Sequence, residues 1–309
     1  MKIAVSGAGG LLGSAIASRL ATAGHDVLRL VRRPPRPGSG EIGWDPDAGT
    51  IDPELGGVAA AIHLAGESIA ARRWTDATRS RILVSRVRGT RLLAETLARL
   101  APRPLVLISA SAVGYYGDRG DTLLDETCGR GSGFLAEVAE AWEHAADPAR
   151  EAGIRVVHLR IGVVLARGGG ALAQLLPAFR LGLGGRLGGG HQYWSWIALA
   201  DLVEVVHHLL DRDDLDGPVN AVTPRPVTNS EFATTLARVL GRPAVLPVPA
   251  PVLRLLLGAM ADEMLLASTR ANPARLTSSG FVFRYPELDG ALRHELGRPM
   301  RRDAAPTGG

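Results

Sequence analysis

The chain is poor in cysteine, in lysine and in long apolar runs. Its 309 residues include one cysteine, Cys128, and one lysine, Lys2. A lone cysteine excludes a disulfide framework and fits a reducing compartment. The apolar run from Val252 to Leu257 is interrupted by Arg254 and is too short to span a bilayer. Because a predicted strand begins at residue 2, there is no room for a signal peptide, and we expect a cytoplasmic protein without a membrane partner.

Charged and aromatic side chains are also scarce. Charged residues make up 21% of the chain, and the formal net charge is +4. A surplus this small and scattered does not predict a nucleic-acid partner. Aromatic residues make up 5% of the chain, so their concentration between His191 and Ile197 indicates either core packing or the wall of a binding site. We predict no metal site.

Glycine, in contrast, is concentrated behind the first predicted strand. The apolar run Ile3 to Val5 predicts a buried strand, and three glycines follow it in a G-x-x-G-x-x-G spacing: Gly7, Gly10 and Gly13. Apolar residues then recur every four positions, as in a helix packed on a sheet, at Leu12, Ile16 and Leu20. A strand, a glycine turn and a helix N-terminus together suit the diphosphate of a dinucleotide.

Each glycine has a predicted task in such a turn. Gly7 allows the tight turn, Gly10 lets the backbone approach a diphosphate, and Gly13 lets the helix lie close to its strand. A G-x-G-x-x-G reading from Gly7 would put Leu12 at its third position and fits less well. A merely flexible turn is the other alternative, whereas a triphosphatase loop is excluded because no Gly-Lys-Ser/Thr follows.

The second predicted strand, Val27 to Val31, ends in Arg32 and Arg33. In a dinucleotide-binding fold this strand end meets the adenosine ribose, where a carboxylate would select NAD. Two guanidinium groups would instead bind a 2′-phosphate. We therefore favour NADP(H), with a solvated strand end as the alternative.

Two further strand ends carry small or hydroxyl side chains. The apolar run Val58 to Leu64 predicts a central parallel strand, and the small residues Ala65 and Gly66 after it leave room for a ligand. The strand Pro104 to Ile108 leads into Ser109-Ala-Ser-Ala-Val-Gly-Tyr-Tyr-Gly117. Hydroxyls at this place would lie where a nicotinamide meets its substrate, although an ordinary polar loop is the alternative.

These alternating strands and helices predict an α/β fold with a parallel sheet of the dinucleotide-binding kind. Residues 299–309 are predicted to be a disordered tail.

The chain resembles the extended short-chain dehydrogenase/reductase superfamily, and within it the atypical epimerase-family proteins with a small C-terminal domain of unknown function. The resemblance extends to about Leu296 and rests on these segments: Gly7 to Gly13, His63 to Glu67, Arg73-Trp74, Ser85-Arg86, Ser109 to Gly117, Gln192 to Ile197, Asn220 to Pro224 and Gly280 to Pro286. It implies a Rossmann-type doubly wound parallel sheet with a smaller C-terminal α+β substrate domain, and NADP(H) in a cleft that the smaller domain closes over an unidentified carbonyl or hydroxyl substrate. On this resemblance we assign residues 1–165 and 192–215 to the NADP-binding domain and residues 166–191 and 216–298 to the smaller domain.

Carried over position by position, the resemblance implies this cofactor site: Gly7, Gly10, Leu11, Leu12, Gly13, Arg32, Arg33, Leu64, Ala65, Gly66, Ser109 and Arg160. It also implies that Ser111 is the catalytic serine and that Tyr115 or Tyr116 matches the tyrosine of the Ser-x-x-x-Tyr-Gly pattern.

One departure concerns the reaction itself. The superfamily transfers a proton with a Tyr-x-x-x-Lys pair, whose lysine lowers the tyrosine pKa. Here the corresponding helix reads Phe134-Leu-Ala-Glu-Val138, with neither residue. Tyr115 and Tyr116 are the tyrosines left to act, and an arginine would have to supply the positive charge.

Three hypotheses follow from these observations. The first is an NADP(H)-dependent oxidoreductase, or an epimerase that works through a transient ketone, in which Ser111 polarises the substrate oxygen. The second is a non-catalytic NADP(H) sensor, motivated by the missing pair. The third is a sugar-nucleotide binder. Homodimerisation is left open.

Overall fold

The computed structural model describes residues 1–70 and 73–300. Its centre is an eight-stranded sheet in the order β12-β8-β6-β5-β1-β2-β3-β4, parallel except for the β3–β4 pair. The strands are β1 (Lys2–Ser6), β2 (Asp26–Val31), β3 (Glu41–Asp45), β4 (Thr50–Ile51), β5 (Ala60–His63), β6 (Val106–Ala112), β8 (Arg155–Ile161) and β12 (Gly217–Ala221). The predicted α/β fold with a parallel sheet is confirmed. The predicted tail falls largely on residues 301–309, outside the described residues.

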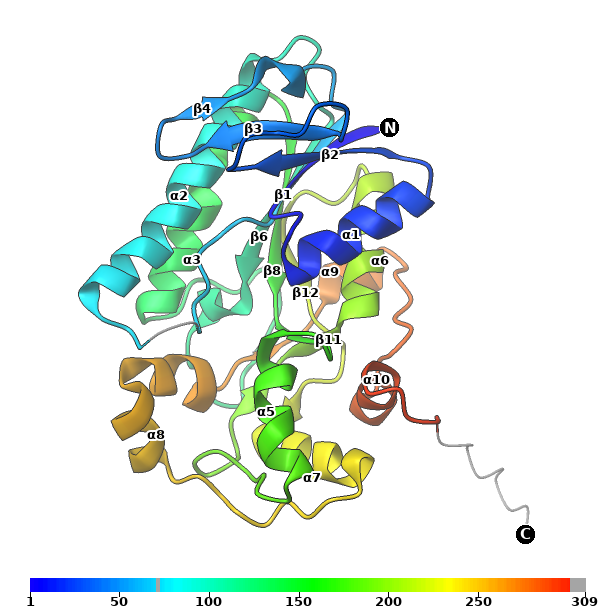
Figure 1. Cartoon of the computed structure of the whole chain (residues 1–309). Coiled ribbons are helices and arrows are strands. Elements are labelled where there is room, and N and C mark those ends of the chain that lie inside the picture. The colour runs from blue at the N-terminus through cyan, green and yellow to red at the C-terminus, as the bar shows by residue number, and fades with distance from the viewer. Residues whose placement is uncertain (71–72, 301–309) are drawn as a thin grey trace.

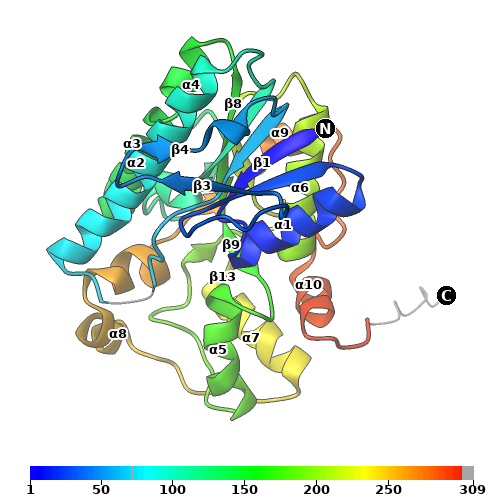
Figure 2. The same ribbon diagram turned by 45° about the horizontal axis from the view of Figure 1, so that its top comes forward.

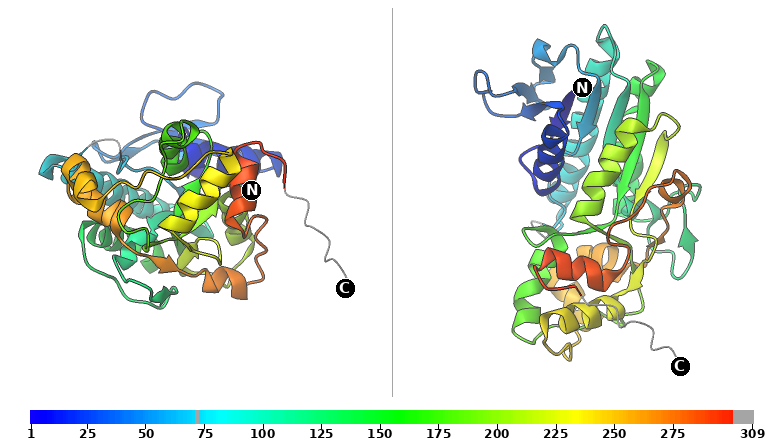
Figure 3. Two further views of the ribbon diagram at one scale, coloured as in Figure 1. Left: turned by 90° about the horizontal axis from the view of Figure 1, so that it is seen from below. Right: turned by 90° about the vertical axis from the view of Figure 1, so that its right-hand side faces the viewer.

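Helices cover both faces of this sheet (Figure 1). On one face lie α1 (Leu11–Thr22) and α6 (Leu199–Asp211), and on the other lie α2 (Asp76–Arg99), α3 (Phe134–His144) and α4 (Asp147–Glu151). The right-hand view of Figure 3 looks at the molecule from the side of α1 and α6. Strand order reverses at β1, which pairs with β2 on one side and β5 on the other. In open parallel sheets ligands bind beyond the strand ends at this reversal.

Each face of the sheet buries its own hydrophobic cluster. Ile16 and Leu20 of α1 pack with strand residues and α6 on one face. Leu93 and Leu97 of α2 pack on the other. The four-residue recurrence in α1 therefore marks its buried face, and fully burying one leucine side chain contributes about 2 kcal/mol.

A second group of elements lies below the sheet in Figures 1 and 2. Its elements are β9 (Val163–Leu165), α5 (Gly170–Arg180), β10 (Tyr193–Trp194), β11 (Trp196–Ala198), β13 (Val227–Thr228), α7 (Asn229–Leu240), α8 (Ala250–Leu257), the π-helical turn η3 (Ala261–Leu266) and α10 (Leu288–Glu295). Trp194 and Trp196 are buried in its core, so the aromatic concentration supplies core packing here.

The remaining short elements connect the two groups. They are η1 (Pro53–Leu55), η2 (Val113–Tyr116), β7 (Leu123–Leu124), β14 (Arg270–Ala271) and α9 (Ala274–Ser278). The buried carboxylate of Asp201 in α6 accepts hydrogen bonds from the backbone amides of Arg284 (2.8 Å) and Tyr285 (2.9 Å). This contact fastens the Gly280 to Pro286 segment onto the helix.

One detail differs from the sequence-based expectation. Strand β12 pairs in parallel with β8 at the edge of the main sheet, whereas the sequence-based division gives residues 217–221 to the smaller domain. Helix α8 ends at Gly258, which has a φ of +64°. A short strand carries too little local pattern to show which sheet it joins.

A capping box marks the start of helix α7. Helix α7 begins at Asn229, and the side chain of Thr228 accepts from the Glu231 amide while Glu231 returns a hydrogen bond. Over the described residues, no helix has both the length and the apolar character needed to cross a bilayer.

Candidate functional site

A cavity of about 800 Å³ opens where the strand order reverses. Its walls come from the glycine loop, the ends of β2 and β5, and one side of α2. The sequence-predicted cofactor residues in these walls are Gly7, Gly10, Arg32, Arg33, Leu64, Ala65 and Gly66. Among the described residues that line it, Leu11, Leu12, Gly13, Ser109 and Arg160 do not occur.

The glycine loop has almost no room for side chains. Gly7 has a φ of +69°, and a Cβ there would lie 2.9 Å from the carbonyl carbon of Leu64. A Cβ on Gly13 would lie 2.2 Å from the Gly7 oxygen, so α1 packs directly on the turn. The Gly10 amide donates to the Gly7 carbonyl (2.9 Å), and α1 begins at the next residue. Gly7, Ala8, Gly9 and Gly10 line the cavity, so the wall that leads into α1 is backbone with no side chain larger than a methyl group.

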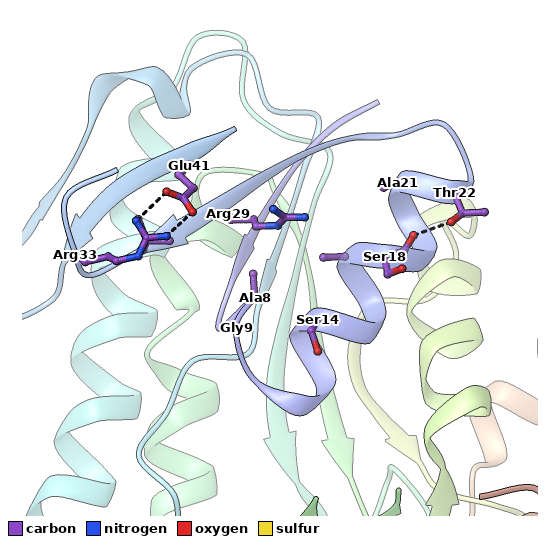
Figure 4. Close-up of a pocket in the computed structure, with 11 residues that line it drawn as sticks. Ala8, Gly9, Ser14, Ser18, Ala21, Thr22, Arg29, Arg33 and Glu41 are labelled. Carbon is purple, nitrogen blue, oxygen red and sulfur yellow. Dashed lines mark hydrogen bonds and ion pairs between the residues drawn. The ribbon is translucent and has the colours of Figure 1, made fainter. Parts of the chain in front are cut away.

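The two arginines at the end of β2 have different surroundings. The Arg33 guanidinium forms a bidentate ion pair with Glu41, whose Oε2 is 2.9 Å from Nη1 (Figure 4). Hydrogen bonds from Arg33 are the main reason that the pKa of the Glu41 carboxyl falls to about 2. Arg32 is exposed at the cavity, and over the described part of the chain it forms no ion pair. Arg32 is thus the guanidinium with free donors for a phosphate.

The Leu64–Gly66 wall is held from two sides. The Ser6 hydroxyl oxygen accepts from the Leu64 amide (3.1 Å) and lies 2.7 Å from Nδ1 of the buried His63. On the opposite side, Arg86 of α2 donates to the Glu67 carbonyl (2.9 Å). Burial lowers the pKa of the Arg86 guanidinium to about 10. The wall is therefore rigid before any ligand arrives.

A connected polar network lies farther along the sheet, at the ends of β6, β8 and β12. The Ser111 hydroxyl donates to Oε1 of Glu143 in α3 (2.7 Å). The same carboxylate receives two hydrogen bonds from Arg160 (2.8 and 2.9 Å), and Arg160 also donates to the Tyr116 hydroxyl (3.0 Å). The Tyr116 hydroxyl donates to Oδ1 of Asn220 (2.8 Å). Ser111, Arg160 and Asn220 are register neighbours on adjacent strands, so their side chains share one face of the sheet.

The two adjacent tyrosines occupy distinct positions in this network. Tyr116 is fully buried, and desolvation raises the pKa of its phenol to about 12. Tyr115 is partly exposed, and the Arg160 guanidinium carbon lies 3.6 Å from the centroid of its ring. Arg160 is therefore the cation beside Tyr115 that the sequence could not identify.

The comparisons with known proteins agree with this geometry. Residues 3–221 match the NAD dependent epimerase/dehydratase family, and residues 248–295 match a domain of unknown function, DUF1731. The epimerase family protein Mb2239 of Mycobacterium bovis is 43% identical over 96% of this chain and 98% of its own length.

The chain belongs to the NAD dependent epimerase/dehydratase family.

Solved structures extend the comparison to the whole fold. The crystal structure of the human epimerase family protein SDR39U1 with NADPH has a TM-score of 0.88 and 36% identity, covering 96% of this chain and 99% of that one. A nucleoside-diphosphate sugar epimerase from Corynebacterium glutamicum has a TM-score of 0.81 and 38% identity, covering 96% of this chain and 58% of that one. The resemblance to the short-chain superfamily's epimerase group is thus confirmed.

Not every predicted site residue of this family member reaches the cavity. Ser109 is fully buried in β6, between His63 on β5 and His158 on β8 in the same register. Leu12 packs on the α1–α6 cluster. The side chain of Leu11 reaches toward Gly169, where an added Cβ would lie 3.2 Å from it. The Leu11 and Leu12 side chains are therefore packing groups, whereas their backbone amides belong to the helix N-terminus.

Sequence reasoning did not identify Glu143, Asn220 or Glu263. Glu143 follows Ala136 and Ala139 at helical spacing on the buried side of α3, and a carboxylate in such a stripe is a signal that could have revealed it. Glu263 of η3 accepts from the amides of Phe134 (3.1 Å) and Leu135 (2.7 Å) and thus caps α3. No local pattern connects residues so far apart.

Proposed function

We propose that this protein is an NADP(H)-binding oxidoreductase or epimerase of the short-chain type, acting on an unidentified carbonyl or hydroxyl compound. The observation that carries the proposal is the cavity at the strand-order reversal, which places the bare glycine loop next to the unpaired Arg32. The NADPH in the crystal structure of the human relative supports the choice of cofactor.

The residues present fit such a cofactor. The amides at the start of α1 would hold the diphosphate, since any side chain at Gly7 or Gly13 would collide with the backbone. Arg32 would bind the 2′-phosphate, while Arg33 is held by Glu41. When bound, the cofactor supplies a hydride for a carbonyl or accepts one from an alcohol.

Tyr115 is the proton donor or acceptor in this proposal. Arg160 lies against its ring, with 3.6 Å between the guanidinium carbon and the ring centroid, and would supply the positive charge that lysine supplies in the superfamily pair. The phenol of Tyr116 is fully buried and hydrogen-bonded to Asn220 and Arg160, so it positions Arg160 instead.

Ser111 takes part as an acceptor. Its hydroxyl has one proton, which it donates to Glu143. Its oxygen lone pairs are then free to accept a hydrogen bond from a substrate hydroxyl. This proposed role differs from the sequence-based hypothesis in which Ser111 polarises the substrate oxygen.

Cofactor choice is tested by calorimetry with NADPH and NADH. The wild type should bind NADPH at least about tenfold more tightly, because a bidentate charged contact contributes more than 1.4 kcal/mol. Arg32→Ala should erase the difference. Arg29→Ala is the matched control, since Arg29 lies on the same strand but lines the neighbouring recess beside α1 (Figure 4). Equal binding of both nucleotides by the wild type would refute the NADP(H) assignment.

A non-catalytic NADP(H) sensor is the second candidate, favoured by the absence of tyrosine and lysine on α3. NADPH absorbance followed against a library of carbonyl compounds separates the two, since a sensor oxidises no cofactor. A sensor should also keep its cellular role in the triple variant Ser111→Ala, Tyr115→Phe and Tyr116→Phe. Cytoplasmic location and homodimerisation stay predictions.

A further inference from the structure

The lower end of the molecule carries exposed apolar side chains on two segments, residues 180–186 and 242–256. We call this surface the basal patch. The segments run side by side, since the Leu246 amide donates to the Gly184 carbonyl (3.3 Å) and Leu187 and Val248 form a parallel bridge. Figures 1 and 2 show the loop before α8, and α8 itself, at this end.

The first half of the basal patch consists of loop residues. Leu181 and Val245 are 74% and 67% exposed, and Leu183 and Leu246 are 54% and 48% exposed. Leucine and valine at such exposure are individually common, but here four of them lie on two adjoining loops.

The second half is a stripe on α8. Val252, Leu255 and Leu256 stand at positions i, i+3 and i+4 and are 42%, 76% and 63% exposed. Leu253 faces the other way and is buried in the core below the sheet. Helix α8 is therefore apolar on both sides, and its outer side contacts no core.

The two segments of the basal patch carry basic side chains and no acidic ones. The sequence has no aspartate or glutamate from residue 152 to 200 or from residue 232 to 261. Arg180, Arg186 and Arg242 are exposed in these two stretches, and within the described residues none of them forms an ion pair. Arg254 is paired with Asp262.

We propose that the basal patch docks this protein on the surface of an anionic lipid bilayer, without spanning it. Two loop tips and one surface helix would insert apolar side chains at the interface, while the three unpaired arginines face lipid phosphates. A second copy is disfavoured as the occupant because it would bring like charges together. This proposal departs from the expectation of no membrane partner, which rested on the lack of a spanning segment.

Co-sedimentation of the full chain with vesicles tests the proposal. Vesicles of equal parts phosphatidylcholine and phosphatidylglycerol should bind the protein, pure phosphatidylcholine should bind it more weakly, and added salt should release it. The double variant Leu255→Asp, Leu256→Asp should lower the partition coefficient at least about tenfold. Val282→Asp is the matched control, because Val282 is 85% exposed but lies outside the basal patch, and it should bind as the wild type does.

Two outcomes would overturn the proposal. One is a wild type that stays in the supernatant with anionic vesicles. The other is a wild-type dimer in light scattering that the double variant converts to a monomer, which would make the basal patch a self-association surface. NADPH binding equal to that of the wild type would show that the double variant is folded.

Discussion

Tyr115 and Tyr116 show at the residue scale how adjacent side chains of one type acquire different roles. Tyr116 is fully buried and donates to Asn220, whereas Tyr115 is partly exposed beside Arg160. The backbone turn η2 sends the two rings in different directions, and their planes are perpendicular (90°).

Removing the hydroxyl should therefore lower the stability of the protein at Tyr116 and its turnover at Tyr115. Tyr116→Phe leaves the Asn220 oxygen without its buried donor and should lower the free energy of unfolding by about 1–3 kcal/mol. Tyr115→Phe should change it by less than about 0.5 kcal/mol but abolish turnover while NADPH binding persists. Urea unfolding and calorimetry measure both effects, and a stability loss confined to Tyr115→Phe would contradict the assignment.

Removal of Glu143 tests the ion pair behind Ser111. The side chains of Arg160 and Glu143 are 4% and 12% exposed, so Glu143→Ala leaves a buried guanidinium without its counterion. We expect a loss of roughly 3 kcal/mol, whereas Glu140→Ala, which removes a partly exposed pair with Arg130, should cost less than about 1 kcal/mol. Similar losses in both variants would show that the Glu143 pair contributes no more than a surface pair.

At the scale of elements, helix α3 depends on a carboxylate from the opposite end of the chain. Its N-cap position is Gly133, which has no side chain to accept hydrogen bonds, and Glu263 of η3 accepts from the first two amides instead. The contact joins the C-terminal segment to the helix that supplies Glu143.

Loss of this cap should weaken α3. Glu263→Ala is expected to lower the free energy of unfolding by about 1–2 kcal/mol, because two helix amides lose their acceptor. The neighbouring Asp262→Ala removes only a half-exposed pair with Arg254 and should cost less than about 1 kcal/mol. Guanidinium unfolding of the two variants side by side gives the comparison, and equal midpoints would argue against the cap.

Two substitutions in the glycine loop should also differ in their effect on stability. Gly13→Ala would place a Cβ 2.2 Å from the Gly7 oxygen and should cost roughly 2 kcal/mol and most of the NADPH affinity. Gly9→Ala meets nothing within 4 Å and should leave the melting temperature of the free protein nearly unchanged. Thermal unfolding with and without NADPH measures both, and a stable Gly13→Ala would show that the turn can shift.

At the scale of the whole molecule, two buried histidines tie stability to pH. Burial lowers the pKa of His63 and of His158 to about 4, well below the ordinary value of a histidine. The unfolded chain therefore binds more protons than the folded one as the pH falls from about 7 to 4. Each histidine should remove up to roughly 3 kcal/mol of stability across this window.

Acid unfolding of single variants checks this expectation. His63→Phe should flatten the slope of the unfolding free energy against pH between about 7 and 4 by up to one proton. The exposed His144 provides the control, and His144→Phe should keep the wild-type slope. The comparison uses the slopes and not the unfolding free energies themselves. Three carboxyls have raised pKa values, and they make the folded protein more stable as the pH falls: Glu126, Asp201 and Glu295. An unchanged slope in His63→Phe would mean that His63 titrates normally in the folded protein.

The sequence by itself determined the elements and the cofactor end of the site. Apolar runs and periodicity defined β1, α1, β5 and β6, and the glycine spacing located the loop at the strand-order reversal. These signals can be recognised in a sequence because they are local. A period of two or of 3.6 residues and a glycine turn depend only on neighbours in the chain.

Tertiary structure decided the rest. It put β12 beside β8, joined Glu263 to α3, and brought Glu143 and Asn220 to Ser111 and Arg160. It also gave Arg32 and Arg33 different surroundings, because Glu41, which pairs with Arg33, lies on the adjacent strand β3. Such contacts join residues that are distant in sequence, and their energy comes from burial and charge pairing that exist only once the sheet has formed.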